Sequence, residues 1–323
     1  MEAYVRADLL NVVTVVFNPI RWKSRLAHYR NFREHMLDSG VKLTVVECAL
    51  GERPHELADT DPHVTHVPVR AETLAWTKEN LTNIGIQRGV PADAKYLAWI
   101  DADVEFSKPG WAADTVHALQ QYAAVQPWST GLDLGPTGEP MLVKGTHVQT
   151  SFAKVWHDTG DIDAWWQQGN VPNYGYPHPG YAWAIRRSVL TNIGGLIEAS
   201  GLGAGDHQMA MAFIGCIEKS IHGETHASYQ DAIRAWGERA YKFVQGNVGF
   251  VSGMISHQWH GEKSKRKYQE RWDVLIKHGF NPMTDLRKNL DGVLELTGNK
   301  PAMMADFDRY FRQRDEDANI RQE

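Results

Sequence analysis

Residues 96–106 read YLAWIDADVEF, and this stretch decides the expected fold. The run YLAWI has the length and composition of a buried strand, and it ends at two acids one residue apart, Asp101 and Asp103. Two such carboxylates repel each other, and their desolvation is costly unless positive charge lies close by. The end of this strand therefore needs a cation or a basic side chain.

Strand-like and helix-like segments alternate on the N-terminal side of this stretch. The sequence predicts strands at residues 11–17, 41–50 and 63–69 and helices at residues 21–39 and 72–89. Such alternation is typical of an α/β protein with a doubly wound, mostly parallel sheet. Ligands of these sheets bind beyond the carboxyl ends of the strands, and Asp101 and Asp103 fall at such an end.

The second half of the chain is less regular. We expect a glycine-rich turn entering a helix at residues 189–215, a strand at residues 248–260 and a charged helix at residues 262–278. We find no internal repeat and no linker rich in Pro and Ser, which favours one continuous domain with irregular elaborations.

Composition limits the class of protein. The net charge of −5 over 323 residues argues against a protein that coats nucleic acid, although local basic patches remain compatible with it. Two cysteines do not make a disulfide framework. The sequence has neither a signal-peptide pattern nor an apolar run of about 18 residues, so we expect a cytoplasmic protein without a membrane partner.

A divalent cation would resolve the repulsion between Asp101 and Asp103. Carboxylates are ligands of Mg²⁺ and Mn²⁺, which typically bind one or two of them together with phosphate oxygens of a substrate. A solvated turn with two acids is the alternative. His257 and His260, at the end of the strand expected at residues 248–260, offer a further ligand, although lone histidines more often only form hydrogen bonds.

Asp206 lies where a glycine-rich turn enters an apolar helix, in GLGAGDHQMAMAFIG (residues 201–215). An acid at such a position is often a helix N-cap. It is also suited to act as a general base if it faces a substrate hydroxyl. The residues alone leave both roles open.

Four short blocks in this order resemble the GT-A glycosyltransferases, in particular the catalytic module of the β-1,4-galactosyltransferases. The blocks are WTKENLTNIGIQRG (76–89), WIDADVEF (99–106), SVLTNIGGLIEASGLGAGDHQ (188–208) and MISHQWHGEKSKRKYQERW (254–272). The resemblance implies a GT-A fold and a metal-dependent, inverting transfer of a sugar from a nucleotide diphosphate sugar, expected to be a UDP-sugar, to an acceptor hydroxyl.

The resemblance also implies roles for individual residues. Asp103, Met254 and His257 would bind Mn²⁺ or Mg²⁺, with His260 as the substitute ligand, and Asp206 would be the catalytic base. Asp101 would contact the ribose or metal-bound water. The further residues implied for donor binding are Lys78, Asn83 and Arg266.

The sequence departs from the family at the glycine-rich turn. Leu202 stands where the family has Trp, and Gly205, Asp206, His207 and Gln208 stand where it has a run of acids, so the sugar cannot be carried over. The segment HQWHG followed by KSKRKYQER also resembles glycosyltransferases of bacterial viruses, whose acceptors include hydroxymethylated bases in DNA. We therefore favour 5-hydroxymethylcytosine in DNA as the acceptor, in the cytoplasm of a bacterial host, over a glycan or small molecule.

We expect a catalytic domain over residues 1–280, with a nucleotide-sugar half to about residue 110, and a helical extension over residues 281–323. Trp165, Trp166 and Tyr174, within an aromatic stretch broken by Gly and Pro, are expected to contact the acceptor. The basic run 263–271 is either a solvated helix face or a grip on the donor diphosphate or a DNA backbone.

Two other classes compete. A nucleotidylyltransferase on the same fold would need a glycine-rich basic loop after the first strand, and NPIRWKSR (18–25) lacks the glycines. A carbohydrate-binding protein without catalysis would leave the acid pair and Asp206 without a role.

Overall fold

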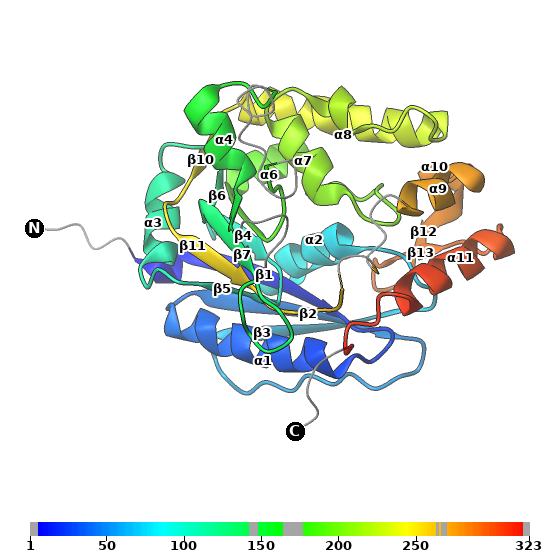
Figure 1. Cartoon of the computed structure of the whole chain (residues 1–323), viewed down its shortest axis with the longest axis horizontal. Helices are drawn as coiled ribbons and strands as arrows, with labels where there is room; N and C mark the ends of the chain where they lie inside the picture. Colours follow the sequence, from blue (N-terminus) through cyan, green and yellow to red (C-terminus); the bar gives the residue numbers. More distant parts are fainter. Residues whose placement is uncertain (1–5, 142–147, 164–176, 263–264, 266–269, 319–323) are drawn as a thin grey trace, which may run out of the picture.

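The computed structural model describes residues 6–141, 148–163, 177–262, 265 and 270–318. Its centre is a seven-stranded sheet of order β10-β6-β9-β4-β1-β2-β3 (Figure 1). The strands are β1 (Leu10–Phe17), β2 (Lys42–Leu50), β3 (Val64–Ala71), β4 (Tyr96–Ile100), β6 (Ala124–Gln126), β9 (Ala182–Arg186) and β10 (Val248–Phe250). Strand β9 runs antiparallel to its neighbours β4 and β6, whereas every other described pair in this sheet is parallel.

Helices cover both faces of this sheet. One face packs against α1 (Lys23–Asp38) and α3 (Trp111–Ala118), with Phe32 and Trp111 buried among strand valines and leucines. The other face packs against α2 (Lys78–Gly89), α6 (Arg187–Ile193), α7 (Gly205–Phe213) and α8 (Ala227–Val244). Figure 1 shows α1 and α2 on opposite sides of β1–β3. The doubly wound, mostly parallel α/β class predicted from the sequence is confirmed.

A second sheet of four strands extends the first beyond the end of β4. It has the order β5-β11-β7-β8, from β5 (Val104–Phe106), β11 (Met254–His257), β7 (Thr130–Asp133) and β8 (Val148–Thr150). The single strand predicted at residues 248–260 is therefore wrong. The chain bends at Gly253, so β10 completes one sheet and β11 pairs with β5 and β7 in the other.

Helix α2 is shorter than predicted. Residues 72–77 do not join it, because their backbone is held elsewhere: Glu72 N–H donates to the buried Glu295 carboxylate (2.8 Å), and Trp76 N–H donates to Gly201 O (2.9 Å). The helix lies very close to the sheet at Gly85, where a Cβ would be 2.6 Å from Val46 Cγ2. The glycine thus lets α2 bring its first turn to the sheet edge.

The chain after residue 280 packs against α2. It contains α10 (Pro282–Asp285), β12 (Leu286–Lys288), β13 (Leu294–Leu296) and α11 (Pro301–Arg312), and Leu294 N–H donates to Asn80 Oδ1 (2.9 Å). The remaining helices are α4 (Phe152–Thr159), α9 (Glu270–Lys277) and the short 3₁₀ turns Ala7–Leu9 and Ile217–Ser220. The division at residue 280 stays a prediction. Among the described helices, none combines the length and apolarity of a membrane span.

Candidate functional site

The turn after β4 is fixed by the strands around it. Thr14 Oγ1 donates to Ile100 O (2.7 Å), Asp101 N–H donates to Tyr181 O (2.8 Å), and Gln258 N–H donates to Asp103 O (2.8 Å). These bonds tie the acid pair to β1, to the start of β9 and to the chain that follows β11. The two carboxylates therefore occupy set positions at the carboxyl edge of the sheet, where they line a pocket of about 380 Å³.

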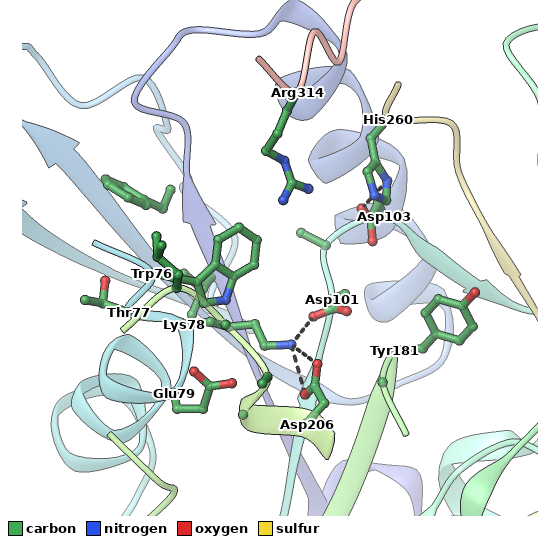
Figure 2. Close-up of a pocket in the computed structure, with 18 of the residues that line it drawn as sticks. Trp76, Thr77, Lys78, Glu79, Asp101, Asp103, Tyr181, Asp206, His260 and Arg314 are labelled. Atoms are coloured by element: carbon green, nitrogen blue, oxygen red, sulfur yellow. Dashed lines mark hydrogen bonds and ion pairs between the residues drawn. The ribbon is translucent and has the colours of Figure 1, made fainter. Parts of the chain in front are cut away.

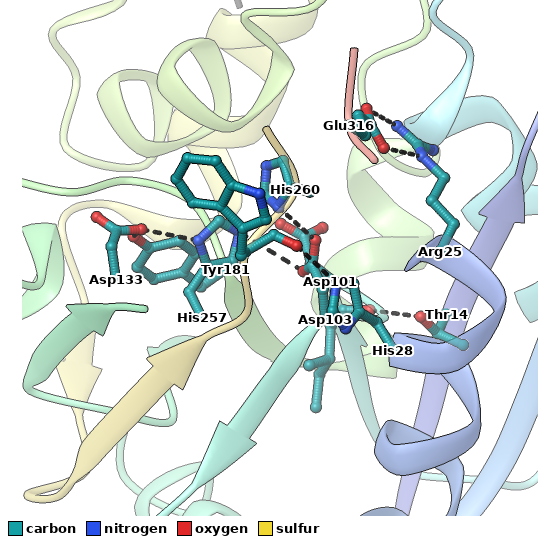
Figure 3. Close-up of polar contacts among 12 residues, drawn as sticks. Thr14, Arg25, His28, Asp101, Asp103, Asp133, Tyr181, His257, His260 and Glu316 are labelled. Atoms are coloured by element: carbon teal, nitrogen blue, oxygen red, sulfur yellow. Dashed lines mark hydrogen bonds and ion pairs between the residues drawn. The ribbon is translucent and has the colours of Figure 1, made fainter. Parts of the chain in front are cut away.

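Asp103, His257 and His260 meet in this pocket. His257 Nε2 lies 3.6 Å from Asp103 Oδ1, and His260 Nδ1 lies 3.1 Å from Asp103 Oδ2 (Figure 3). One ligand atom from each side chain lies within 4.8 Å of the others. Burial disfavours the charged carboxylate, yet the two imidazoles hold the pKa of Asp103 well below its ordinary value. The three side chains lie close enough together to hold one metal ion.

A buried network orients His257. Its Nδ1 lies 2.8 Å from Asp133 Oδ1, and Asp133 also accepts the Tyr181 hydroxyl (3.0 Å) and the Gln149 amide (2.5 Å). Because the carboxylate can only accept, Nδ1 carries a hydrogen, and Nε2, the nitrogen that faces Asp103, is the one left to bind a cation. A carboxylate behind a histidine in this way is the usual outer partner of a metal-binding imidazole.

Tyr181 holds this network at the cost of backbone strain. Its φ of +70° is a left-handed conformation that non-glycine residues rarely adopt. The ring stacks on His178 at a centroid distance of 3.9 Å and lies 4.6 Å from the His257 ring. Strain of this kind is often found at functional sites, where packing over-determines the conformation.

Met254 does not join the ligand group. It lies at the start of β11, 40% exposed, whereas His257 lies at the end of the same strand and is buried. Side chains three residues apart in a strand point to opposite faces, and about 10 Å of strand separates these two. Met254 is therefore not positioned to bind a metal ion together with Asp103 and His257. His260 lies beside these two residues instead and is the third candidate ligand.

A second charged group lies in the same pocket. Lys78 Nζ contacts Asp101 Oδ1 at 3.0 Å and both Asp206 oxygens at 3.0 and 3.1 Å (Figure 2). Burial lowers the pKa of Lys78, but the carboxylates of Asp101 and Asp206 raise it well above its ordinary value. Burial and the nearby acids raise the pKa of Asp101 to about 6. The lysine thus joins the first turns of α2 and α7 to the end of β4.

Asp206 is not the N-cap of α7. The cap position is Ala204, with φ of +78°, and Asp206 is the second helical residue, with its carboxylate directed to Lys78. The structural reading of this acid as a cap is therefore wrong. Asp206 lines the pocket, with its carboxylate beside Lys78 Nζ.

Glu79 is the least expected acid of the pocket. It is 3% exposed, and burial raises the pKa of its carboxyl to about 7. No described side chain donates a hydrogen bond to it. A Cβ on Gly205 would lie only 2.2 Å from Glu79 Oε1, so the missing side chain at position 205 makes room for this carboxylate.

Asn83 lies outside the pocket, contrary to its expected role at the donor. Its amide donates to Leu196 O and Glu198 Oε1, both at 3.0 Å, and its carbonyl accepts Leu196 N–H at 2.8 Å. All these bonds anchor the turn before α7. Arg266, Trp165, Trp166 and Tyr174 lie outside the described residues.

Sequence reasoning missed several residues of the pocket. Besides Glu79 and Asp133 they include His178, Arg25, Arg314 and Trp76. Asp133 ends a short strand and carries no motif, and Arg314 lies in a segment that reads as a charged tail. The strand-end position of Asp133 was the one available signal, since strand ends gather at the same edge of a sheet.

Comparison with protein-family models and with curated proteins finds no match. Solved structures with a related fold include β1,4-galactosyltransferase 7 of Drosophila, in a complex with manganese, UDP-Gal and xylobiose, at 12% identity and a TM-score of 0.36, covering 89% of this chain and 92% of that one. Glucosyl-3-phosphoglycerate synthase of Mycobacterium tuberculosis, in complex with Mg²⁺ and UDP, has 10% identity and a TM-score of 0.38, covering 85% and 79%.

A third similar structure is 4-diphosphocytidyl-2C-methyl-D-erythritol synthase of Anaerococcus prevotii, with 9% identity and a TM-score of 0.33, covering 84% of this chain and 96% of that one. Identities and TM-scores this low assign no activity. The functional argument therefore rests on the geometry of the pocket.

Replacing Asp133 by Asn tests the orientation of His257. The amide keeps the shape but no longer selects the Nδ1–H form of the imidazole, so we expect Mn²⁺ affinity to fall about 10–100-fold. Isothermal titration with Mn²⁺ measures this. Asp231→Asn, on the exposed face of α8, is the control. Unchanged Mn²⁺ affinity in Asp133→Asn would remove the supporting role of Asp133.

Replacing Glu79 by Gln tests the buried acid through pH. The pKa of Glu79 rises from 4.5 to about 7 on folding, so the native state binds the extra proton between these values and stability falls as pH rises through this window. At pH 8 the Gln variant should be more stable by up to about 3 kcal/mol, and at pH 4 the two proteins should converge.

Urea unfolding at several pH values measures the effect of Glu79→Gln. The exposed Glu238→Gln on α8 should leave the pH profile as it is in the wild type. A wild-type profile that stays flat from pH 4.5 to 7, or a Gln variant that is less stable at pH 8, would contradict the raised pKa.

Proposed function

We propose that this protein is a metal-dependent glycosyltransferase that moves a sugar from a nucleotide diphosphate sugar to an acceptor hydroxyl. One observation carries the proposal: the cation-binding arrangement of Asp103, His257 and His260 shares a pocket with the Lys78–Asp206 pair at the carboxyl edge of a doubly wound sheet. The order of the sequence blocks that resemble GT-A glycosyltransferases supports the same chemistry.

The donor atoms fit a divalent cation that accepts both oxygen and nitrogen. One carboxylate and two imidazoles face each other, and Asp133 orients one of the imidazoles. Mg²⁺ prefers an all-oxygen shell, so this set favours Mn²⁺ over Mg²⁺. When bound, the cation would neutralise the negative charge that develops on the departing diphosphate.

Asp206 would act as the base. Its carboxylate would take the proton of the acceptor hydroxyl as that oxygen forms a bond to the anomeric carbon, while the bond from this carbon to the diphosphate breaks and its electron pair leaves with the nucleotide. A single displacement of this kind inverts the anomeric carbon. Lys78 would keep Asp206 in place between α2 and the sheet, and Asp101 would contact the donor ribose or metal-bound water.

The competing classes fit the pocket less well. A carbohydrate-binding protein without catalysis has no use for two imidazoles and a carboxylate gathered around one point, nor for a base held by a buried lysine. A nucleotidylyltransferase would need phosphate-binding glycines after β1, and the chain there continues directly into α1 through NPIRWK.

For the acceptor we propose 5-hydroxymethylcytosine in DNA. The support comes from the sequence: the likeness of the histidine segment to enzymes of bacterial viruses, and the basic run that follows it. A base in a duplex would have to be flipped out to reach the pocket. A glycan or small-molecule acceptor is the alternative, and the net charge of −5 favours it.

Asp206→Asn tests the base. The amide cannot take a proton, so we expect transfer to fall at least about 100-fold while Mn²⁺-dependent UDP binding stays within about threefold of the wild type. Asp103→Asn is the matched variant, which should lose Mn²⁺-dependent UDP binding itself. Calorimetry gives the binding, and release of UDP gives the turnover. Full turnover in Asp206→Asn, or in excess EDTA, would contradict the mechanism.

The acceptor is tested by mass spectrometry. Duplexes with 5-hydroxymethylcytosine, matched duplexes with cytosine and a set of simple glycans are each incubated with Mn²⁺ and a panel of nucleotide sugars. We expect a mass increase of one sugar on the hydroxymethylated duplex alone, with a rate that falls steeply between 50 and 200 mM salt because phosphate contacts release counterions. If only the glycans gain a sugar, the DNA acceptor is wrong and a glycan is the acceptor.

A further inference from the structure

Residues 314–318, which follow α11, run back along the side of the pocket that carries Asp103, His257 and His260. Asp317 accepts hydrogen bonds from Lys23 N–H and Ser24 N–H, both at 2.9 Å, at the first turn of α1. Trp259, which lies between the two site histidines in the sequence, donates from Nε1–H to the carbonyl of Ala318 (3.0 Å), the last residue of this segment. A Cβ at Gly261 would lie 2.8 Å from Arg314 O. Residues 314–318 are therefore packed against both α1 and the chain after β11.

This segment buries a carboxylate between two arginines. Glu316 is fully buried, and Arg25 donates to it through Nη2 (2.7 Å) and Nε (2.5 Å) (Figure 3). Arg314 donates to the same carboxylate through Nε (2.8 Å). Burial opposes its charge, but the two guanidinium groups keep the pKa of Glu316 well below its ordinary value. Two cations against one anion leave an excess of one positive charge beside the pocket.

The two arginines differ in what they have left to donate. Every nitrogen of Arg25 has an acceptor, because Nη1 donates to Phe17 O (2.7 Å) in addition to the bonds of Nε and Nη2 to Glu316. Arg314 uses only Nε, and neither of its terminal nitrogens has a hydrogen-bond acceptor among the described residues. Arg314 is nevertheless only 7% exposed. The contacts with Glu316 and Phe17 thus engage all three nitrogens of Arg25, whereas the contact with Glu316 engages only one nitrogen of Arg314.

Arg314 points into the pocket. Its guanidinium lies over the Trp76 ring, 5.0 Å from the centroid, which fixes the plane of the fork. Figure 2 shows it directed into the space between Trp76 and the side chains of Asp103 and His260. Arg314, Asp103 and His260 line one cavity. A ligand that occupies this cavity and reaches Asp103 and His260 therefore passes the terminal nitrogens of Arg314.

We propose that Arg314, supplied by the segment after α11, binds the diphosphate of the donor nucleotide. This inference rests on the proposed function. Phosphate oxygens match the planar fork of a guanidinium, which can bind two of them at once. The excess positive charge offsets one of the two negative charges of a donor diphosphate, and the two terminal nitrogens of Arg314 receive acceptors. The part of the donor that Arg266 was expected to hold would thus be held by a residue 48 positions further along the chain.

Calorimetry with UDP and with uridine, both in saturating Mn²⁺, tests this assignment. Arg314→Ala should weaken UDP binding about 10–100-fold, the usual loss for a charge-assisted bidentate contact, and leave uridine binding within twofold. Arg314→Lys keeps the charge and the pair with Glu316 but loses the fork, so it should fall between wild type and Ala. Arg312→Ala, exposed and two residues earlier, is the control and should bind UDP normally.

The outcomes separate the two proposals. A wild-type protein that binds no UDP with Mn²⁺ would overturn the proposed function and this inference with it. Normal UDP binding in Arg314→Ala would overturn the inference alone. A parallel loss of UDP and uridine binding, or a loss of Mn²⁺ affinity, would show that Arg314 only supports the fold, and would also overturn the inference.

Discussion

The contact of Lys78 with Asp101 and Asp206 is the interaction on which the site depends. It joins three segments that are far apart in the sequence: the first turn of α2, the end of β4 and the first turn of α7. With Glu79, Asp103 and Asp133, five carboxylates of the described residues line one pocket, and their mutual repulsion is unfavourable without compensation. Lys78 compensates for two of them, and the two site histidines compensate for Asp103.

The pocket is therefore divided by charge. On one side Lys78 holds Asp206 and Asp101, and on the other Asp103 faces two imidazoles, with Arg314 and Arg25 behind them. Under the proposed function, the first side would receive the acceptor hydroxyl, and the second would receive the cation and the donor phosphates. Tyr181 lies between them and connects them through Asp133, His257 and the backbone of Asp101.

Local patterns predicted the parts of this molecule that local patterns control. The apolar run before Asp101 and the alternation of strands and helices are features of short-range sequence, and they predicted the sheet class and the edge that carries the site. The division of residues 248–260 between two sheets was not predictable, because it depends on which distant strands, β6 or β5 and β7, accept each half. Met254 was misplaced for that reason: the family spacing was applied to a strand whose faces were unknown. Arg314 lies in no motif, and Glu79 lies in the block 76–89 but was given no role there, so only long-range packing shows where both side chains lie.

The return of residues 314–318 to the first turn of α1 also concerns synthesis of the chain. Asp317 bonds to a residue 294 positions earlier, and the same short segment brings Arg314 to the pocket. A nascent chain can form its sheet and gather the acids and histidines while it is still attached to the ribosome. If Arg314 binds the diphosphate as proposed, a polypeptide that ends before residue 314 would have the proposed cation ligands but would bind a nucleotide weakly.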